Sequence, residues 1–499
     1  MLKMKYMKFI AVGIIALISL SCSDFLDKNP LDQISSETFW QNEQEAKMAL
    51  TGVYSRLRAF TFTHKDTEFD IMAGDVCGNQ GHSIINIAQG NIEPNSGGIV
   101  SYIYSNCYAG IGSCNFFLEN IEKTPISTET LNVYKGEVCF LRALFYFTLT
   151  EHYGGVPLYT SPVTIEEAKV KQSTKEEVVN QILSDLDFAI ANLPDKTYSS
   201  GHAVKGSAMT LKAKVLLHNQ RWQESAEIAD QIIRDGKFSL YNDFRNLFLS
   251  SGQKNNPEII FSTRYLNPDI YSDLDIRWSW HAVVEPRQEL VDAYECADGK
   301  PIDMSPLYDP SNWRLNRDPR LLMTIKAFED SVYNSAGQKV GFNYNAVSAT
   351  GYSPVKYCNW DALPINYSTH SDQDWILLRY ADVLLMYAEA RNEVSGPDAS
   401  VYDAINKVRD RVNMPQLPTG LSKDEMRKRI RNERRVEFAL EGIRWGDIKR
   451  WKTAETYIPT LVDPGGKRRQ FDPAKHYLLP FPQREMDVNK NLIQNPGYN

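Results

Sequence analysis

The sequence lacks the short motifs that mark common catalytic and metal sites. It has no nucleophile elbow, P-loop, HExxH or CxxC pattern, and its eight histidines include no pair at metal-ligand spacing. The 55 basic residues are outnumbered by 62 acidic ones, so the formal net charge is −7 at pH 7. Nucleic-acid binding usually needs a basic surface. The composition therefore excludes nucleic acid as the main partner, and no motif indicates an enzyme.

Cysteines are few and scattered, so a disulfide framework is not expected. After Cys22, six cysteines remain and none of them forms a CxxC pair. These six are Cys77, Cys107, Cys114, Cys139, Cys296 and Cys358. Since 42% of the residues are hydrophobic, we expect a large core rather than cross-links to stabilise the fold.

The apolar run near the start of the chain is too short to span a membrane. It extends from Phe9 to Ile18, about half of the ~20 residues that a spanning helix needs. Three lysines precede it and the short stretch Ser19 to Ser21 follows it, which is the order found in a secretory signal. The sequence therefore predicts an exported protein with a signal peptide over residues 1–21.

Cys22 stands where the signal is expected to be cleaved, as in a bacterial lipoprotein signal. Cleavage there would leave Cys22 as the first residue, acylated on its thiol and amine. Ser19 occupies the position three before the cysteine, where such signals usually have leucine. We predict acylation of Cys22 followed by a tether over residues 22–35, because several acyl chains anchor a protein firmly. An ordinary signal peptide and a disulfide-bonded cysteine are the alternatives.

Amphipathic helices are expected to dominate the first half of the chain. Apolar residues recur there at helical spacing in four segments. The segments begin at residues 36, 101, 131 and 175, and the last three end near residues 122, 153 and 194. The predicted fold class is therefore mainly α.

Two later stretches have the pattern of paired helices that cross closely. In residues 204–238, small residues alternate with bulky ones, and the two helices are expected to join at 218–221. A similar pair is expected at 377–413. Helical hairpins that recur without an exact sequence period predict a TPR-like superhelix. The predicted organisation is a single body over 36–499, with hairpins near 36–245 and 377–452.

Residues 250–376 differ in character from the helical stretches. They are rich in Asn, Asp, Gly, Pro, Trp and Tyr, and contain strand-like runs such as EIIFSTRYL. We therefore predict an irregular insertion of loops and short strands. Long insertions on a rigid scaffold commonly carry binding sites, so ligand binding is predicted here.

The stretch RWSWHAVVEP contains the strongest local cluster of aromatic residues. Sugar rings stack on aromatic planes, and their hydroxyls need polar partners. On an extended chain Trp278 and Trp280 would share one face, with Arg277 and His281 beside them. Tyr265, Tyr271 and Asp273 lie just upstream and are weaker candidates. Packing of either tryptophan in a satellite core is an equally weighted alternative.

A charged run near residues 427–451 invites a catalytic interpretation. Glu433, Glu437 and Glu441 recur at every fourth position among arginines. Glycoside hydrolysis needs two carboxyl groups across a cleft, whereas carboxylates at helical spacing among arginines make ion pairs more simply. We therefore predict structural ion pairs for these three glutamates.

Many stretches together resemble the SusD/RagB family. They include FLDKNPLDQISSETFWQNEQEAKMALTGVYSRLR, GEVCFLRALFYFTLTEHYGGVPL, NPEIIFSTRY, LVDAYECADGKPI, NRDPRLLMTI, ILLRYADVLLMYAEA, RIRNERRVEFALEGIRWGDIKRW and YLLPFPQREMDVNKNLIQNPGY. The resemblance covers essentially the whole mature chain, in the family's order. It implies an outer-membrane lipoprotein that binds nutrients at the cell surface.

The resemblance also implies candidate ligand residues on one helix and the loop before it. In the family that helix commonly reads Trp-x3-Tyr-x2-Ile-x3-Asn, and its Trp is often near ligand. The same frame here holds Tyr104, Tyr108, Ile111 and Asn115, so the first aromatic ring is smaller and carries a hydroxyl. The preceding polar loop, 74–98, would set specificity, and its Asp75 matches a recurrent acidic position.

The family further implies a role as a non-catalytic binder that captures oligosaccharides or polysaccharide. The implied partner is a SusC-like TonB-dependent transporter in the same outer membrane, reached by anchoring at Cys22. Binding of peptides, as in RagB-like members, or general TPR-type protein interaction is the alternative, and a hydrolase is a distant third. No cofactor is expected. A structural Ca²⁺ is a weaker hypothesis that rests on Asp298, Asp303, Asp309 and Asp318, whose spacing matches no EF-hand loop.

Overall fold

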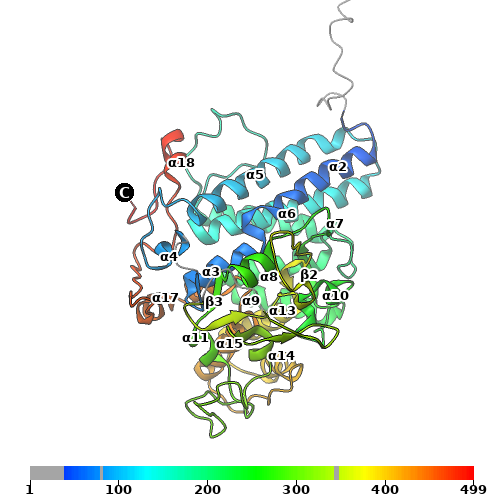
Figure 1. The fold of residues 1–499 in the computed structure, drawn as a ribbon. Coiled ribbons are helices and arrows are strands. Elements are labelled where there is room, and N and C mark those ends of the chain that lie inside the picture. The colour runs from blue at the N-terminus through cyan, green and yellow to red at the C-terminus, as the bar shows by residue number, and fades with distance from the viewer. Residues whose placement is uncertain (1–38, 79–82, 342–347, 499) are drawn as a thin grey trace, which may run out of the picture.

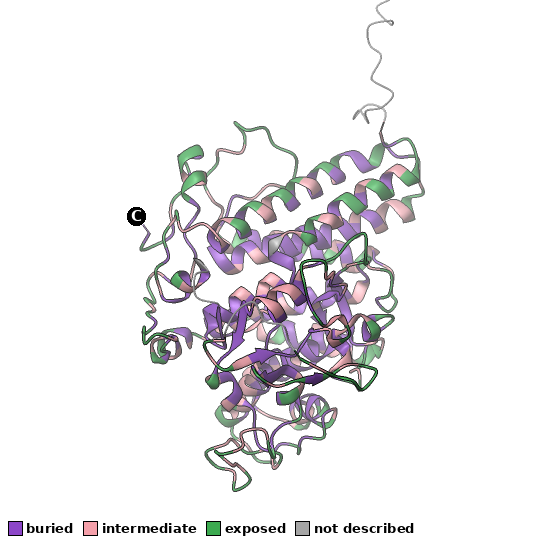
Figure 2. Ribbon diagram, in the orientation of Figure 1, coloured by how far each residue is buried: buried purple, intermediate pink, exposed green. Residues whose placement is uncertain are grey.

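A computed structural model describes residues 39–78, 83–341 and 348–498 of the chain. The predicted signal peptide, Cys22 and the tether over 22–35 lie outside the described residues. Helices make up most of the body, and short strands gather on one side of it (Figure 1). Buried residues run through the centre of the helical region and of the region that carries the strands. Exposed residues line the outer faces of the helices and loops (Figure 2). The mainly α prediction is confirmed.

The first half of the body is built mainly from α-helices of 6 to 26 residues. They are α2 (Glu43–Tyr54), α3 (Thr67–Ala73), α4 (Ser83–Ala88), α5 (Ile99–Asn120), α6 (Thr128–Tyr153) and α7 (Lys175–Asn192). α6 packs against both α5 and α7. The helix predicted from Ser36 begins later, because residues 39–42 are not helical and Asn42 caps α2 by accepting the Glu45 N–H at 3.0 Å.

The predicted helical hairpins are confirmed as pairs of packed helices. The first is α8 (Lys205–His218) and α9 (Trp222–Asp235), and the second is α13 (Tyr380–Ser395) and α14 (Ala399–Asp410). The Ser225 hydroxyl donates to the Ala213 carbonyl oxygen at 2.9 Å, so small residues do bring α8 and α9 close. α9 also packs on α13, which stacks one hairpin against the other as in TPR-like folds.

The middle of the chain supplies short strands that pair two by two. The antiparallel pairs are β1 (Val76–Gly78) with β3 (Val284–Pro286), β2 (Ile259–Thr263) with β8 (Trp375–Arg379), β4 (Ile325–Ala327) with β7 (Tyr352–Pro354), and β5 (Val332–Tyr333) with β6 (Lys339–Val340). The β2–β8 pair leads directly into α13, so it joins the short strands to the helical hairpins.

The basic run of the sequence forms a buried ion-pair network. Arg379 Nη1 lies 2.6 Å from Glu437 Oε1 and 2.8 Å from Glu258 Oε1, and its Nη2 lies 2.7 Å from Glu441 Oε1. Glu433 pairs with two further buried arginines at 2.6 and 2.8 Å. The predicted structural pairing of these three glutamates is confirmed. The helical spacing does not run through all three, because α15 (Lys423–Glu437) and α16 (Arg444–Arg450) are separate helices and Glu441 lies in the turn between them.

The last described residues return to the first helices. The Leu479 N–H donates to the His152 carbonyl oxygen at 2.7 Å, and Asn495 Nδ2 donates to the Tyr153 carbonyl oxygen at 3.0 Å. The Phe481 ring stacks on that of Tyr153 with centroids 5.8 Å apart. α18 (Gln483–Val488) is thereby held near the start of α5 (Figure 1). Within the described residues, no helix combines the length and apolarity needed to cross a membrane.

Candidate ligand-binding sites

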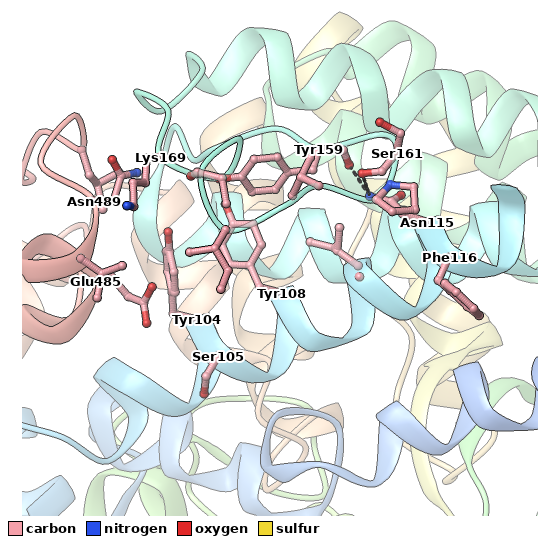
Figure 3. Close-up of a pocket in the computed structure, with 18 of the residues that line it drawn as sticks. Tyr104, Ser105, Tyr108, Asn115, Phe116, Tyr159, Ser161, Lys169, Glu485 and Asn489 are labelled. Carbon is pink, nitrogen blue, oxygen red and sulfur yellow. Dashed lines mark hydrogen bonds between the residues drawn. The ribbon is translucent and has the colours of Figure 1, made fainter. Parts of the chain in front are cut away.

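A groove of about 670 Å³ runs along one side of α5 (Figure 3). Its other walls are the segment 159–169, which follows α6, and α18 with the residues just after it. Tyr104 and Tyr108 are four positions apart on α5, so both rings lie on the face that lines this groove. We call it the α5 groove. Its further lining residues are Ser105, Ile111, Gly112, Asn115, Phe116, Tyr159, Ser161, Pro162, Val163, Ile165, Ala168, Lys169, Arg484, Glu485, Val488, Asn489 and Leu492.

Polar atoms on the floor of the α5 groove already have partners within the protein. The Tyr108 hydroxyl donates to the Pro157 carbonyl oxygen at 2.6 Å, and the Tyr159 hydroxyl donates to that of Ala168 at 2.7 Å. Asn115 Nδ2 donates to the carbonyl oxygens of Tyr159 and Ser161 at 3.0 and 3.1 Å. These bonds fix the segment after α6 over α5. The rings of Tyr108 and Tyr159 line the groove, while their hydroxyls are bonded to the backbone.

Tyr104 and Tyr108 occupy the motif positions that the resemblance singled out. Their ring centroids lie 4.6 Å apart, and Tyr104 also packs edge-on against Tyr153 and Phe481. Only 6% of Tyr104 is exposed, so most of its ring serves packing between α5, α6 and the C-terminal segment. Tyr108 and Tyr159 are half-buried, with ring centroids 5.8 Å apart.

A second aromatic site lies on the middle segment of the chain. The Trp280 ring meets that of Tyr367 edge-on at 4.4 Å and that of His281 at 5.0 Å, and Tyr271 stacks on His370 at 3.6 Å. Tyr367 is 72% exposed, whereas Trp280 and His281 are half-buried. We call these five residues the aromatic surface cluster.

Two loop segments build this cluster by bonding to each other. The backbones of Ser272 and Ser371 exchange hydrogen bonds at 2.8 and 3.1 Å. Buried Asp275 accepts bonds from the Ser371 hydroxyl at 2.8 Å, the Asn359 N–H at 2.9 Å and Gln373 Nε2 at 3.0 Å. A carboxylate with three donors rigidly joins segments about a hundred positions apart. The exposed rings therefore rest on a fixed base.

The predicted geometry of the tryptophan pair is wrong. Residues Ile276–Trp280 form a π-helical turn rather than an extended strand, so the two side chains do not share a face. Trp278 is 1% exposed and packs edge-on against Tyr357 and Trp375, with centroids 6.2 and 6.3 Å away. It belongs to the core, as the packing alternative held, and presents no surface for a ligand. Trp280 is the member that reaches the surface.

Asp75 also has a structural role. It is 1% exposed, and its Oδ1 accepts bonds from Arg435 Nε at 2.9 Å and Nη2 at 2.5 Å. It therefore ties the segment after α3 to α15 and is not accessible to a ligand. The loop 74–98 that it opens includes β1 and α4, with residues 79–82 outside the described part.

Two other candidates are half-buried near the aromatic surface cluster. The Tyr265 N–H donates to Asp374 Oδ1 at 3.0 Å. Arg277 Nη2 lies 3.8 Å from Glu68 Oε1. Burial raises the pKa of Glu68 to about 7, and the charge of Arg277 opposes this shift. The ligand contacts of these two residues stay predictions.

The described residues contain no group of three or more His, Cys, Asp or Glu side chains arranged to hold a metal ion. Of the aspartates considered for calcium, Asp318 is buried against Arg320 at 2.7 Å, and Asp309 accepts bonds from Ser311. The six cysteines after Cys22 are all buried and unbonded to one another. Burial is the main cause that raises the pKa of the Cys139 thiol to about 12.

Several site residues were missed by reasoning from sequence. Tyr367 and His370 lie in a loop without any periodic pattern, and they reach Trp280 and Tyr271 only through the folded chain. Tyr159 and Glu485 join the α5 groove from segments more than 300 residues apart. Aromatic residues in polar loops were the available signal for the first pair. No local signal existed for the second.

Packed helical hairpins that carry a rigid aromatic surface on inserted loops define a class of binding protein. Two family models match the chain. One, described as "Starch-binding associating with outer membrane", matches residues 24–217, and the other, described as "SusD family", matches residues 253–498. Together they cover most of the chain. The chain belongs to the SusD family.

Relatives and solved structures agree with this assignment. SusD-like protein P2 from Formosa agariphila is 28% identical to this chain, over 98% of this chain and 100% of its own length. The structure of a SusD-like carbohydrate binding protein from Bacteroides fragilis is 27% identical, with a TM-score of 0.81 over 91% of this chain and 100% of that one. A laminarin binding SusD-like protein is 25% identical, with a TM-score of 0.74 over 92% and 100% of the two chains.

Proposed function

We propose that this protein is a cell-surface lipoprotein that captures oligosaccharides or polysaccharide and delivers them to a SusC-like TonB-dependent transporter. The observation that carries the proposal is the aromatic surface cluster. Tyr367 and Trp280 offer exposed ring area on a base fixed by Asp275. Sugar C–H faces stack on such rings, and the neighbouring polar loop residues are available to sugar hydroxyls.

The comparisons support carbohydrate as the ligand class. Two structural relatives carry names that state carbohydrate or laminarin binding, and one matching family model is described as starch-binding. The ligand-contacting residues proposed here are Trp280, His281, Tyr271 and Tyr367. Trp278 and Asp75 act through packing and ion pairing instead.

The outer-membrane location and the lipid anchor belong to the same proposal. The family description names association with the outer membrane, and Cys22 follows a lipoprotein-like signal. Acyl chains on Cys22 would hold the body beside a transporter in the same membrane. The protein itself binds without turnover, because the carboxylates that suggested a glycosidase are neutralised in buried arginine pairs.

Native affinity electrophoresis tests the proposal. The mature chain with Cys22→Ser is run through gels that each contain one polysaccharide, beside Trp280→Ala, Tyr367→Ala and Tyr104→Ala. We expect one polymer to retard the parent chain, and each of the first two substitutions to weaken binding by about tenfold, or roughly 1.4 kcal/mol. Tyr104→Ala removes a ring from the α5 groove and should leave retardation unchanged if the protein stays folded.

Other outcomes have definite meanings. Retardation that depends on Tyr104 and not on Trp280 would move the glycan site to the α5 groove. Release of new reducing ends over time would contradict the non-catalytic part of the proposal. Failure of every polymer to bind, together with capture of peptides from a defined pool, would replace the glycan proposal with the peptide-binding alternative.

A further inference from the structure

Three aromatic rings and one carboxylate meet at one end of the α5 groove (Figure 3). The rings are Tyr104, Tyr108 and Tyr159, and their planes differ by 51° between the first two and by 63° between the last two. Glu485, on α18, directs its carboxylate toward the Tyr104 ring. Within the described part of the chain, that half-buried carboxylate has no hydrogen bond or ion pair.

The charge of Glu485 acts on the tyrosines around it. Burial, and after it the negative charge of Glu485, raises the pKa of Tyr159 to about 12. The same two causes lead the shift that raises the pKa of Tyr104. This end of the groove therefore combines the negative faces of aromatic rings with an unneutralised negative charge, which favours a cation.

The basic residues nearby do not neutralise this site. Lys169 Nζ lies 2.9 Å from both carboxylate oxygens of Glu166, on its own segment, and it remains 37% exposed. Arg484 is exposed at the rim, next to Glu485 in sequence. Adjacent positions on a helix do not face each other, so Arg484 is not placed to pair with that carboxylate.

The rest of the α5 groove requires a ligand with an apolar body. Its volume of about 670 Å³ far exceeds that of an ammonium group. Its walls include side chains with large exposed fractions, namely Ile165 at 76%, Val488 at 56%, Phe116 at 49% and Val163 at 41%. Sugar is a poor occupant, because the hydroxyls of Tyr108 and Tyr159 already donate to backbone carbonyl oxygens.

We infer that the α5 groove binds an organic cation with an apolar body, its ammonium or guanidinium group lying among the tyrosine rings beside Glu485. The apolar body then covers the exposed aliphatic wall. A free alkylammonium compound and a Lys or Arg side chain flanked by apolar residues in a peptide share this chemistry. The site is separate from the aromatic surface cluster, so the inference is independent of the proposed glycan function.

Isothermal titration calorimetry with three probes that share one tail tests the charge preference. The mature chain with Cys22→Ser is titrated with decyltrimethylammonium, decanoate and the neutral decyldimethylamine oxide, each below its micelle concentration. We expect the cation to bind at least tenfold more tightly than decanoate. Glu485→Gln keeps the shape of the side chain and should weaken cation binding by about five- to tenfold.

Two variants make the test specific. Asp487→Asn removes an exposed carboxylate from the same helix, one that bonds to Gln483 and Lys490 and does not line the groove, and it should leave the affinity unchanged. Tyr159→Leu removes one ring and should weaken the cation several-fold. Circular dichroism confirms that each variant is folded. Glu485→Gln should leave retardation in glycan gels unchanged. Failure of the cation site can therefore be distinguished from failure of the proposed glycan function.

The source of the cation is distinguished by competition. The peptide acetyl-Leu-Lys-Leu-amide, beside its norleucine analogue, is titrated against the bound alkylammonium probe. If the lysine peptide displaces the probe and its norleucine analogue does not, the ligand is a polypeptide side chain. If the alkylammonium probe binds and neither peptide displaces it, the ligand is a free amine. Both outcomes support the site. Equal affinity for all three decyl probes, tighter binding of decanoate, or no effect of Glu485→Gln would overturn the inference.

Discussion

Trp278 and Trp280 are two positions apart and yet occupy different environments. The π-helical turn over Ile276–Trp280 directs Trp278 into the core against Trp375, while Trp280 meets the exposed Tyr367. One residue type therefore packs in the core at one position and lies at the surface two positions later. At the scale of single residues, burial decides the role.

This difference predicts opposite effects of two similar substitutions. Trp278→Ala should lower the free energy of unfolding by about 3–5 kcal/mol, because it leaves a large cavity in a packed core. Trp280→Ala should lower it by less than about 1 kcal/mol, because its ring already lies at the surface. Urea unfolding followed by circular dichroism measures both. Equal losses from the two substitutions would contradict the assigned environments.

The residues of α5 illustrate how one helix serves two surfaces. Gly110 faces α6, where a Cβ atom would lie 2.6 Å from the Phe145 ring. Gly112 faces the α5 groove, where a Cβ atom would meet no atom within 4 Å. The inner glycine permits close packing of two long helices. The outer one has no such constraint in this structure.

At the scale of this helix, we predict opposite signs for two Gly→Ala substitutions. Gly110→Ala should lower the free energy of unfolding by roughly 1–3 kcal/mol, because a rigid ring in the core must shift. Gly112→Ala should raise it by up to about 1 kcal/mol, because alanine favours the helix and meets no neighbour. Thermal unfolding of both variants provides the measurement. A stabilising Gly110→Ala would refute the packing described for α5 and α6.

Elements with a local pattern could be predicted, and elements fixed by distant contacts could not. The α8–α9 hairpin follows from spacing and small residues inside one segment, and its predicted joint at 218–221 agrees with the observed bounds. The break between α15 and α16 depends on Leu440 and Gly442, both at positive φ, which the buried Glu441 pairs hold in place. The partners of Glu441 are Lys356 and Arg379, which lie elsewhere in the chain.

The two candidate sites obey the same rule. Tyr104 and Tyr108 could be named because they stand at two positions of the helix motif that the family resemblance implied, and their spacing places both on one face of α5. Their neighbour Glu485 comes from the opposite end of the chain, and Tyr367 reaches Trp280 through a bridge between two irregular loops. Loop conformations of that kind are set by tertiary contacts such as those of Asp275. Sequence periodicity therefore does not predict these loop conformations.

Across the whole molecule, Asp463 connects three distant parts. It accepts bonds from Gln89 Nε2 at 3.0 Å, Arg287 Nη1 at 2.8 Å and Arg469 Nε at 3.0 Å. Although burial acts to raise it, the bond and charge of Arg469 keep the pKa of Asp463 below its usual value. A charged carboxylate at this point links the first helices, the middle insertion and the C-terminal segment.

We predict that Asp463→Asn lowers the free energy of unfolding by roughly 3–5 kcal/mol, because it removes the carboxylate partner of buried Arg469 and one of the two carboxylate partners of buried Arg287. The transition should stay single, with tryptophan fluorescence and circular dichroism changing together. Asp487→Asn serves as the exposed control and should stay within about 0.5 kcal/mol of the parent. Two separated transitions would show that the parts unfold independently.

The return of the C-terminal segment to α6 has a consequence for when the protein folds. Asn495 bonds to Tyr153, 342 positions earlier, so the packing around α6 is incomplete until the far end of the chain is present. Closing a loop of that length costs entropy before any contact compensates, and such topologies fold slowly. A chain that emerges from its first residue onward would therefore stay incompletely folded around α6 until Asn495 has been synthesised.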